Sequence, residues 1–476
     1  MHWLPETRAA RVLAVVVTGY ILLFWWLAWR KFEYCTAETG DAAVINHMFW
    51  SSLHGKFFWH FVIDRSYFAM HQEWLALLIW PLYALFPTPK TLFFIETFCL
   101  GISAVPMFLI ARRVLDDDWS ALFSAVALLF FPTVVSQNVN NLHSSPWVLP
   151  LLLSAFYFFL VGNYRWFVVF SILAALGKEN TPLTLLAFAP YALWQRRGRE
   201  WWITPVVIAV VSLFLSFKVV GPYFARGWKY EALGYLSNLG HSWGEILQNV
   251  FLNPPKLVDA LFQPSNGLFL FYLLQPALWI LPFFAPEVIF ALPDLGTNLI
   301  AGNTGMKVIQ WHYNVNVGGF LVVACVFAIP RLQRWMHRRG KTDVRLTPAL
   351  PALLAAMAIA HWPFWFSPNH YQPLPHYEAQ LRARSLVPPD ASLIVGPNLI
   401  LGPFSGRMSI TANNLVNNDP QKMFLYDWAY FDMNYPWYVP PVPRETVAAF
   451  ANNPDYELVF SEKNIFVFRR RDHGSR

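Results

Sequence analysis

Ionisable residues in this chain are concentrated in short polar stretches between long, aromatic-rich runs that carry almost no charge. Hydrophobic residues make up 56% of the 476 residues and charged residues only 13%, with a mean hydropathy of +0.36. A soluble protein needs more charge than this to cover its surface, so the pattern indicates an integral membrane protein. The 23 Trp, 19 Tyr and 42 Phe fit that class, because amphipathic rings favour the headgroup layer.

Eleven apolar runs approach the length of about 20 residues that a spanning helix needs. The predicted spans are 11–29, 91–111, 119–136, 147–161, 165–177, 181–195, 202–220, 268–284, 286–301, 315–330 and 347–366. The stretch 74–86 is only thirteen residues long and contains Pro81, so we expect it to lie at the membrane interface.

Basic clusters orient these spans. With the N-terminus inside, the inner loops hold Arg112 and Arg113, Arg165, Arg196–Arg199 and the arginines of 331–345, as the positive-inside rule requires. The odd number of spans then places the C-terminus outside. The net charge of +7 comes mostly from these clusters, so it indicates topology and contact with membrane lipids, not nucleic-acid binding.

From His370 onward the sequence becomes polar and rich in Pro and Asn, with the strand-like runs SLIVGP, ELVF and NIFVFRR. We therefore predict an all-α polytopic membrane domain at 1–369, with a large first outer loop at 30–90. A small α+β domain at 370–476 is expected to follow outside the cytoplasm. The three cysteines show neither a disulfide framework nor a zinc-binding spacing.

The first outer loop carries a pair of acids, Glu38 and Asp41, followed by His54. An acid at the membrane surface can act as a general base on an acceptor hydroxyl, and it can also bind a divalent cation. Asp41 is equally suited to cap the helix that AAVINHMFW predicts, and the capping and catalytic interpretations are compatible.

Three histidines stand at predicted membrane boundaries: His71, with Glu73 two residues on; His143, in NVNNLHSSP; and His312, beside Tyr313. Each could contact a sugar or phosphate, and each could instead be a structural hydrogen-bonding residue. Since no two histidines lie three or four residues apart, we predict no metal site built from histidine.

Lys178 and Glu179 interrupt two apolar runs at LAALGKENTPLTLL. Such a pair can neutralise itself as a structural ion pair. A lysine facing a cavity can also bind a lipid phosphate as a point charge. The sequence leaves both interpretations open.

Short motifs in a fixed order resemble a broad family of bacterial and archaeal multi-pass proteins, domain of unknown function family 2079. That family shows Asp, Gln-x-x-Trp and His-Gly in its first outer loop; this chain has His47 at the Gln position. The matching residues are Asp41, Trp50, His54, Gly55, His71, Pro81, Tyr83, Pro87, His143, Pro146, Lys178, Glu179, His312 and Tyr313.

The family is similar to the GT-C class of membrane glycosyltransferases. The resemblance implies a multi-pass protein of a bacterial or archaeal cell membrane, with Asp41 as catalytic acid in the first outer loop. It implies a polyprenyl-phosphate sugar as donor and a glycan, lipid or protein as acceptor. The expected substrate-binding residues are Glu38, His54, His71, Glu73, His143, Lys178, Glu179, His312 and Tyr313.

Two other functions stay open at this point. A lipid-linked sugar flippase or other transporter would need ionisable groups near the middle of its spans, whereas most predicted spans here are free of charge in their interiors. A non-catalytic envelope assembly protein would use its outer domain for function, and eleven spans are more than an anchor requires.

Overall fold

The protein divides into two compact units. The computed structural model describes residues 6–36, 40–140, 142–227, 231–340, 345–361, 366–396, 401–412, 416, 419–434 and 442–471. The helical unit comprises Met1–Trp25, Phe68–Leu78 and Phe94–Phe366. The sheet unit comprises Trp26–Tyr67, Ile79–Phe93 and Ser367–Arg476, so it contains most of the first outer loop as well as the C-terminal region.

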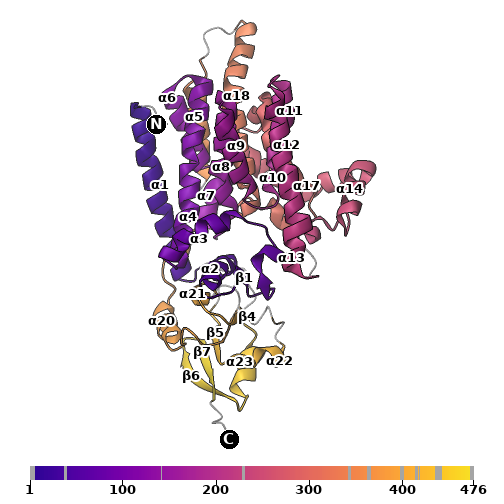
Figure 1. Ribbon diagram of the computed structural model, residues 1–476. Helices are drawn as coiled ribbons and strands as arrows, with labels where there is room; N and C mark the ends of the chain where they lie inside the picture. Colours follow the sequence, from indigo (N-terminus) through magenta and orange to yellow (C-terminus); the bar gives the residue numbers. More distant parts are fainter. Residues whose placement is uncertain are drawn as a thin grey trace. The chain divides into compact units, whose positions relative to one another are not determined.

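Helices dominate the first three quarters of the chain (Figure 1). The α-helices there are α1 (Arg8–Glu33), α2 (Gly40–Leu53), α3 (Leu75–Leu85), α4 (Pro89–Ile102), α5 (Ala104–Leu115), α6 (Asp118–Leu129), α7 (Pro132–Val139), α8 (Leu149–Val161), α9 (Tyr164–Ala175), α10 (Thr181–Leu186), α11 (Phe188–Trp194), α12 (Arg199–Phe214), α13 (Gly221–Ala225), α14 (Trp243–Leu252), α15 (Pro254–Leu261), α16 (Pro264–Leu274), α17 (Leu292–Ile300), α18 (Val315–Arg338) and α19 (Ala349–His361). The 3-10 and π segments are η1 (Tyr67–Ala69), η2 (Ser145–Val148), η3 (Leu215–Val220), η4 (Glu231–Leu236), η5 (Gln275–Ala277), η6 (Leu281–Phe284), η7 (Pro286–Phe290), η8 (Thr304–Lys307) and η9 (His312–Asn314).

Four helices in the described residues are long and apolar enough to cross a membrane, by length and composition: Arg8–Glu33, Pro89–Leu115, Arg199–Ala225 and His312–Arg338. Two bent pairs, Asp118–Phe130 with Pro132–Val139 and Pro254–Leu261 with Pro264–Ala277, raise the number to six if each pair is one span. The predicted count of eleven is therefore not confirmed, although the helical membrane architecture is.

Prolines explain where two predicted spans fail to form single helices. The run 181–195 is divided into α10 and α11, because Pro190 has no N–H to donate to the carbonyl of Leu186. The run 286–301 begins as the 3-10 turn η7 and becomes helical only as α17, with Pro293 near its start. The hydropathy pattern predicted both runs as continuous spans and did not predict these interruptions.

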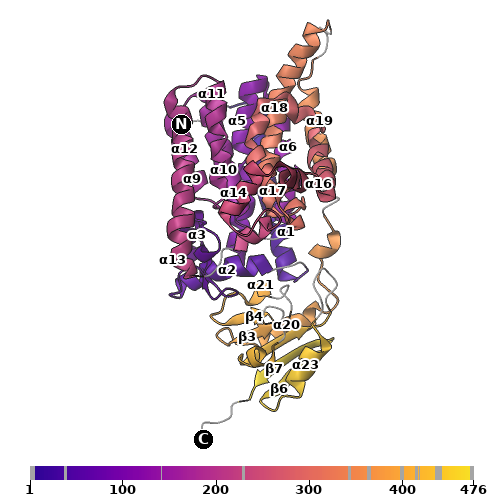
Figure 2. The same ribbon diagram turned by 90° about the vertical axis from the view of Figure 1, so that its right-hand side faces the viewer.

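The core of the helical unit is built around α18, which contacts α5, α6, α7 and α8 (Figures 1 and 2). Of the fifteen residues of α18 from Val315 to Ile329, fourteen are buried. Gly318 and Gly319 allow the close approach, since a Cβ at Gly318 would overlap Thr133 and lie 2.8 Å from Cδ1 of the Phe131 ring.

A buried ion pair joins α18 to η7. Arg331 donates through Nη1 and Nη2 to the two carboxylate oxygens of Glu287, at 2.6 and 2.9 Å. Tyr191 of α11 donates its hydroxyl to the same carboxylate at 2.6 Å. Glu287 is fully buried, and a buried carboxylate of this kind is tolerated only with such partners.

The sheet unit contains a five-stranded mixed sheet in the order β4-β3-β5-β7-β6. Its strands and helices are β3 (Leu393–Val395), β4 (Ile410–Ala412), β5 (Trp428–Asp432), β6 (Tyr456–Glu462), β7 (Ile465–Arg470), η11 (Pro368–Tyr371), α20 (Tyr377–Ser385), α21 (Leu401–Phe404), α22 (Pro420–Met423) and α23 (Arg444–Ala451). A two-stranded ribbon, β1 (Trp59–His60) with β2 (Arg65–Ser66), lies in the first loop. The strand-like runs SLIVGP, ELVF and NIFVFRR fall in β3, β6 and β7, so the prediction of a small C-terminal sheet is confirmed.

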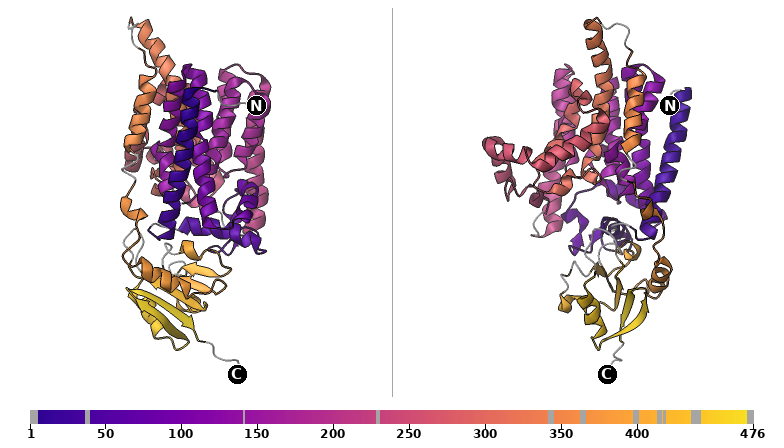
Figure 3. Two further views of the ribbon diagram at one scale, coloured as in Figure 1. Left: turned by 90° about the vertical axis from the view of Figure 1, so that its left-hand side faces the viewer. Right: turned by 180° about the vertical axis from the view of Figure 1, so that it is seen from behind.

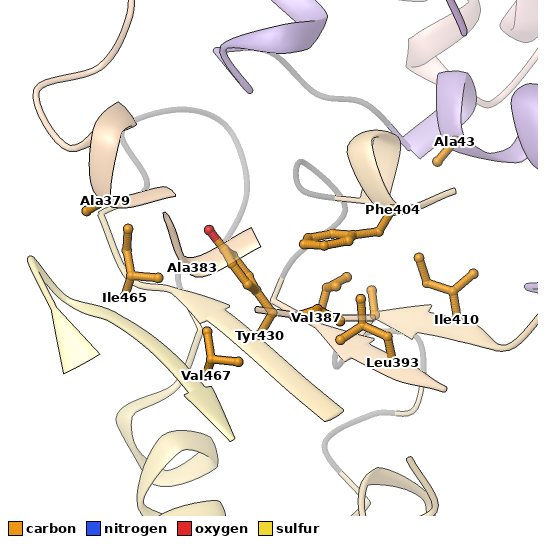
Figure 4. Packing of buried hydrophobic residues seen from close by; sticks show 12 residues of the cluster. Ala43, Ala379, Ala383, Val387, Leu393, Phe404, Ile410, Tyr430, Ile465 and Val467 are labelled. Atoms are coloured by element: carbon orange, nitrogen blue, oxygen red, sulfur yellow. The ribbon is translucent and has the colours of Figure 1, made fainter. Parts of the chain in front are cut away.

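The sheet is covered on both faces. One core contains Leu393, Val395, Tyr430 and Val467 with Ala379 and Ala383 of α20, Phe404 of α21 and Ala43 of α2 (Figure 4). The opposite core contains Ile394, Ala429, Phe431 and Phe468 with Phe450 of α23. Because side chains alternate along a strand, the uniformly apolar β3 supplies both cores.

The contact at Gly318 leads to a prediction about stability. Gly318→Ala should destabilise the protein by about 1–3 kcal/mol, because the buried Thr133 and Phe131 side chains must move to admit a methyl group. Gly267→Ala in α16 is the matched control, since nothing lies within 4 Å of its Cβ position. Thermal unfolding of the two detergent-purified variants measures the difference; equal midpoints would contradict the packing described here.

Candidate functional site

A break between α9 and α10 presents the Lys178–Glu179–Asn180 sequence. The break begins at Gly177, where a Cβ would overlap Val148 and lie 3.0 Å from the Ala174 carbonyl oxygen. The carbonyl of Leu176 accepts a hydrogen bond of 2.7 Å from Leu75 N–H. The end of the first outer loop is therefore attached directly to this interruption.

His71 and Glu179 form the central hydrogen-bonded pair of the region. Nδ1 of His71 lies 2.8 Å from Oε1 of Glu179, and the two side chains are 14% and 6% exposed. The second carboxylate oxygen accepts the backbone N–H of Gln72 at 3.2 Å. A carboxylate held by two donors in an apolar region fixes the position of the imidazole.

His143 and His312 form a parallel ring stack with centroids 3.3 Å apart and planes inclined by 6°. Nδ1 of His143 accepts the backbone N–H of Ser145 at 3.2 Å. Because a backbone N–H can only donate, this nitrogen carries no proton, and the ring is neutral with its proton on Nε2. Tyr313 contacts the far end of the stack, with its ring 4.0 Å from that of His312.

Burial lowers the pKa of His143 well below its usual value, and the nearby charges of His312, Lys178 and His71 lower it further. These electrostatic contacts bring together residues from four separate segments of the chain. The cationic cluster, as we call it, consists of His71, His143, Lys178, Glu179 and His312. Five of the predicted site residues therefore lie in one region of the helical unit, with the buried Glu73 two residues beyond His71.

Two buried carboxylates beside the cationic cluster were not predicted. Glu96 of α4 accepts the backbone N–H of His143 at 3.0 Å. Asp294 of α17 accepts hydrogen bonds from Asn180, Thr184 and Asn316 at 3.2 to 3.4 Å. Their signal in the sequence was an acid inside an apolar run, a position that is costly unless the group has partners.

The other predicted site residues lie in the sheet unit or outside the described residues. Asp41 is exposed in the first turn of α2, where the helix dipole favours a negative charge. His54 is exposed near the end of the same helix; its Nδ1 lies 2.8 Å from the Trp50 carbonyl oxygen, and its ring stacks on Trp50. Glu38 falls outside the described residues.

His47, which stands where the family pattern has Gln, is a buried structural residue. Its Nδ1 and Nε2 lie 2.9 and 3.1 Å from the carbonyl oxygens of Trp59 and Arg407. The Arg407 side chain donates to the carbonyls of Phe404, Pro388 and Ala391. Arg407 is thus buried, and its guanidinium group is committed to backbone carbonyls.

Within the residues that the structure describes, no three His, Cys, Asp or Glu side chains are grouped so as to hold a metal ion.

The chain belongs to the family described as "Predicted membrane protein (DUF2079)", whose model matches residues 36–414. No curated protein matches the chain significantly. Among solved structures, the fold is similar to ArnT from Cupriavidus metallidurans bound to undecaprenyl phosphate, with a TM-score of 0.56 and 14% identity over 97% of this chain and 99% of that one. The apo form of the same protein gives a TM-score of 0.53 and 15% identity over 95% and 98%.

These likenesses establish the fold class. ArnT is a GT-C glycosyltransferase, so the chain is a membrane protein with a GT-C-like fold. The identities of 14% and 15% concern the fold alone.

The lowered pKa of His143 leads to a prediction about pH. In the unfolded chain this histidine binds a proton as the pH falls through about 6.5, whereas in the folded chain it stays neutral. Stability should therefore fall between pH 7.5 and 5.5, and His143→Gln should remove about 1 kcal/mol of that fall.

Thermal midpoints at the two pH values measure this effect. The matched control is His54→Gln, which changes an exposed histidine and should leave the pH dependence as in the wild type. An unchanged pH dependence in His143→Gln would contradict a neutral, buried ring.

Proposed function

We propose that the protein is a membrane glycosyltransferase that moves a sugar from a polyprenyl-phosphate donor to an envelope glycan, lipid or protein on the outer face. The observation that carries the proposal is the cationic cluster, in which Lys178 and His71 come together from distant segments beside two stacked histidines. A cluster of this kind is suited to the phosphate of a lipid donor, because the fold brings a lysine and imidazole donors together before a ligand binds.

The proposed role of the cluster is to stabilise the departing lipid phosphate. Lys178 supplies a compact point charge. His71 supplies a second hydrogen-bond donor, and Glu179 orients its ring. His312 lies against His143, and its Nε2 is buried without a hydrogen-bond partner in the described part of the chain. That nitrogen is a third group able to reach a ligand.

Asp41 is the proposed general base. Its carboxylate would take the proton of the acceptor hydroxyl while the oxygen attacks the anomeric carbon of the donor sugar. The new C–O bond forms as the bond from the anomeric carbon to the phosphate oxygen breaks, and polyprenyl phosphate leaves with the electron pair. A single in-line displacement of this kind inverts the anomeric configuration.

The likeness to ArnT supports a lipid-phosphate donor, since that protein was solved with undecaprenyl phosphate bound. The membrane setting supports it as well. A polyprenyl tail stays in the bilayer while its sugar stands at the surface, so a boundary site meets the donor without extracting it. The sugar, the acceptor and the linkage are left open by this proposal.

Removing the proposed base should abolish transfer. Asp41→Asn is expected to lower activity at least a hundredfold while the protein stays folded in the membrane, because the amide cannot accept the proton. The matched control is Asp64→Asn, which makes the same change at an exposed aspartate of the same loop.

The readout is complementation of a deletion strain, in which we expect an envelope glycan that lacks one sugar and an accumulated lipid-linked donor. Normal glycan in the strain that carries Asp41→Asn would refute the base assignment.

Removing the side chain that we propose binds the donor phosphate should weaken donor binding. Lys178→Gln is expected to raise KM for the lipid-linked donor about tenfold or more, whereas Lys256→Gln, in α15 away from the cationic cluster, should not. Initial rates in membranes at varied donor concentration give KM and kcat. An unchanged KM would show that Lys178 does not contact the phosphate.

A transporter of lipid-linked sugars is the second candidate, favoured by the buried acids Glu96, Glu287 and Asp294 inside the helical unit. Glu287 is paired with Arg331 and Tyr191, and Asp294 is held by three polar side chains, so both have a structural role. Binding of purified donor without turnover would favour transport over transfer.

A further inference from the structure

A cavity lies in the helical unit, and none of its lining residues belongs to the cationic cluster. Its volume is about 580 Å³, a size typical of small-molecule and headgroup sites. It is bounded by the C-terminal end of α5, the last turns of α18 and Thr347, which precedes α19. Those last turns of α18 extend beyond the neighbouring helix ends (Figures 2 and 3). The positive-inside rule assigns this end of α18 to the cytoplasmic side.

The polar wall of the cavity consists of hydrogen-bond donors and cations. Arg331, Arg334 and His337 line it together with Gln333 and Thr347, and the described lining includes no carboxylate. Gln333 uses its amide oxygen to accept Leu346 N–H at 3.4 Å, which turns its NH₂ group toward other acceptors. The wall is therefore built to receive an acceptor of negative charge.

The net charge of the polar wall suits a ligand that carries one negative charge. Glu287 neutralises Arg331, and together with the Phe327 carbonyl it uses three of the five guanidinium N–H groups. The remaining N–H groups keep their direction, because the ion pair fixes the guanidinium. Arg334 is exposed and adds a positive charge to the wall; in the described part of the chain it is bonded to the Pro330 carbonyl and to no carboxylate.

The apolar wall consists of Val114 and Leu115 of α5 with Phe327 and Pro330 of α18. A cavity that combines a donor-rich wall with an apolar wall at the end of a membrane-spanning helix fits an amphiphile better than a fully hydrated ion. Basic pockets between helices on the cytoplasmic side are a recurrent form of anionic-lipid site.

Three aspartates follow Leu115 in the turn between α5 and α6, and two of them are already committed. Asp117 accepts Ser120 N–H at the start of α6, and Asp118 is paired with Arg112 at 2.6 Å. Asp116 ends α5 in a left-handed conformation and is absent from the described lining. The cavity itself therefore keeps its excess of donors.

We propose that this cavity binds the phosphodiester headgroup of an anionic phospholipid of the inner leaflet. The phosphate accepts hydrogen bonds from Arg331 and Arg334, and the glycerol and upper acyl carbons lie against the apolar wall. The apolar wall favours a phosphodiester lipid over inorganic phosphate, which has no apolar part to place against it. This site does not depend on the proposed sugar transfer.

The test is a lipid titration of the full-length protein in a mild non-ionic detergent, with the thermal midpoint as readout. The probes are phosphatidylglycerol, phosphatidylcholine and inorganic phosphate. Phosphatidylglycerol should stabilise the wild type at lower concentration than phosphatidylcholine, and 10 mM inorganic phosphate should not displace it.

Arg334→Gln should raise the apparent Kd for phosphatidylglycerol about fivefold. The matched control is Arg339→Gln, which removes the same charge from an exposed residue that stacks on Trp335 outside the cavity, and it should leave Kd unchanged. Both residues are exposed, so neither change should shift the midpoint without lipid.

Equal losses in the two variants would overturn the site in favour of diffuse surface attraction. A wild type that does not distinguish the two lipids, or competition by inorganic phosphate, would overturn the lipid assignment. None of these readouts involves glycan synthesis, so a failed transferase proposal leaves this one standing.

Discussion

The hydrogen bond between His71 and Glu179 is the contact on which the architecture of the candidate site depends. It joins the end of the first outer loop to the break between α9 and α10, more than a hundred residues later. A nearly buried carboxylate is stable only with its partners, so the pair fixes the loop and the break together. The backbone bonds of Gln72 and Leu75 to the same turn make the attachment a three-point one.

The same constraint explains the rest of the helical unit. Three acids buried there have specific donors: Glu96 receives His143 N–H, Asp294 receives three side chains, and Glu287 receives Arg331 and Tyr191. In an apolar interior such partners are obligatory, and they determine which helices lie side by side. The GT-C-like fold thus holds a polar interior in which Glu96, Asp294 and Glu287 are bound by donors from other segments of the chain.

The sequence predicted the character of the fold better than its details. Apolar runs and basic loops were sufficient to predict a helical membrane protein, and the run NIFVFRR to predict a strand. The breaks at Pro190 and Pro293 were not predicted, because hydropathy averages over a run and does not register a missing N–H. The sheet unit also contains most of the first outer loop, through contacts such as that of Ala43, and no local pattern carries long-range contacts of that kind.

At the candidate site, Lys178, Glu179, His71, His143 and His312 stood out because ionisable groups near a membrane are costly. The sequence could not show that two of the histidines stack or that Glu179 pairs with His71, since the partners are separated by 108 to 169 residues. Asp294 and Glu96 were overlooked because a single acid did not disturb the apolar average around it. The role of Asp41 as catalytic base stays a prediction. Because Asp41 lies in the sheet unit, the geometry of the ligand-bound protein is what tests that role.

The most direct measurement is a cryo-EM structure of the full-length protein with undecaprenyl phosphate bound. The account predicts phosphate density beside the Nζ of Lys178 and the ring of His71, with the Asp41 carboxylate facing the same space. Phosphate density away from the cationic cluster, or Asp41 directed elsewhere in that complex, would contradict it.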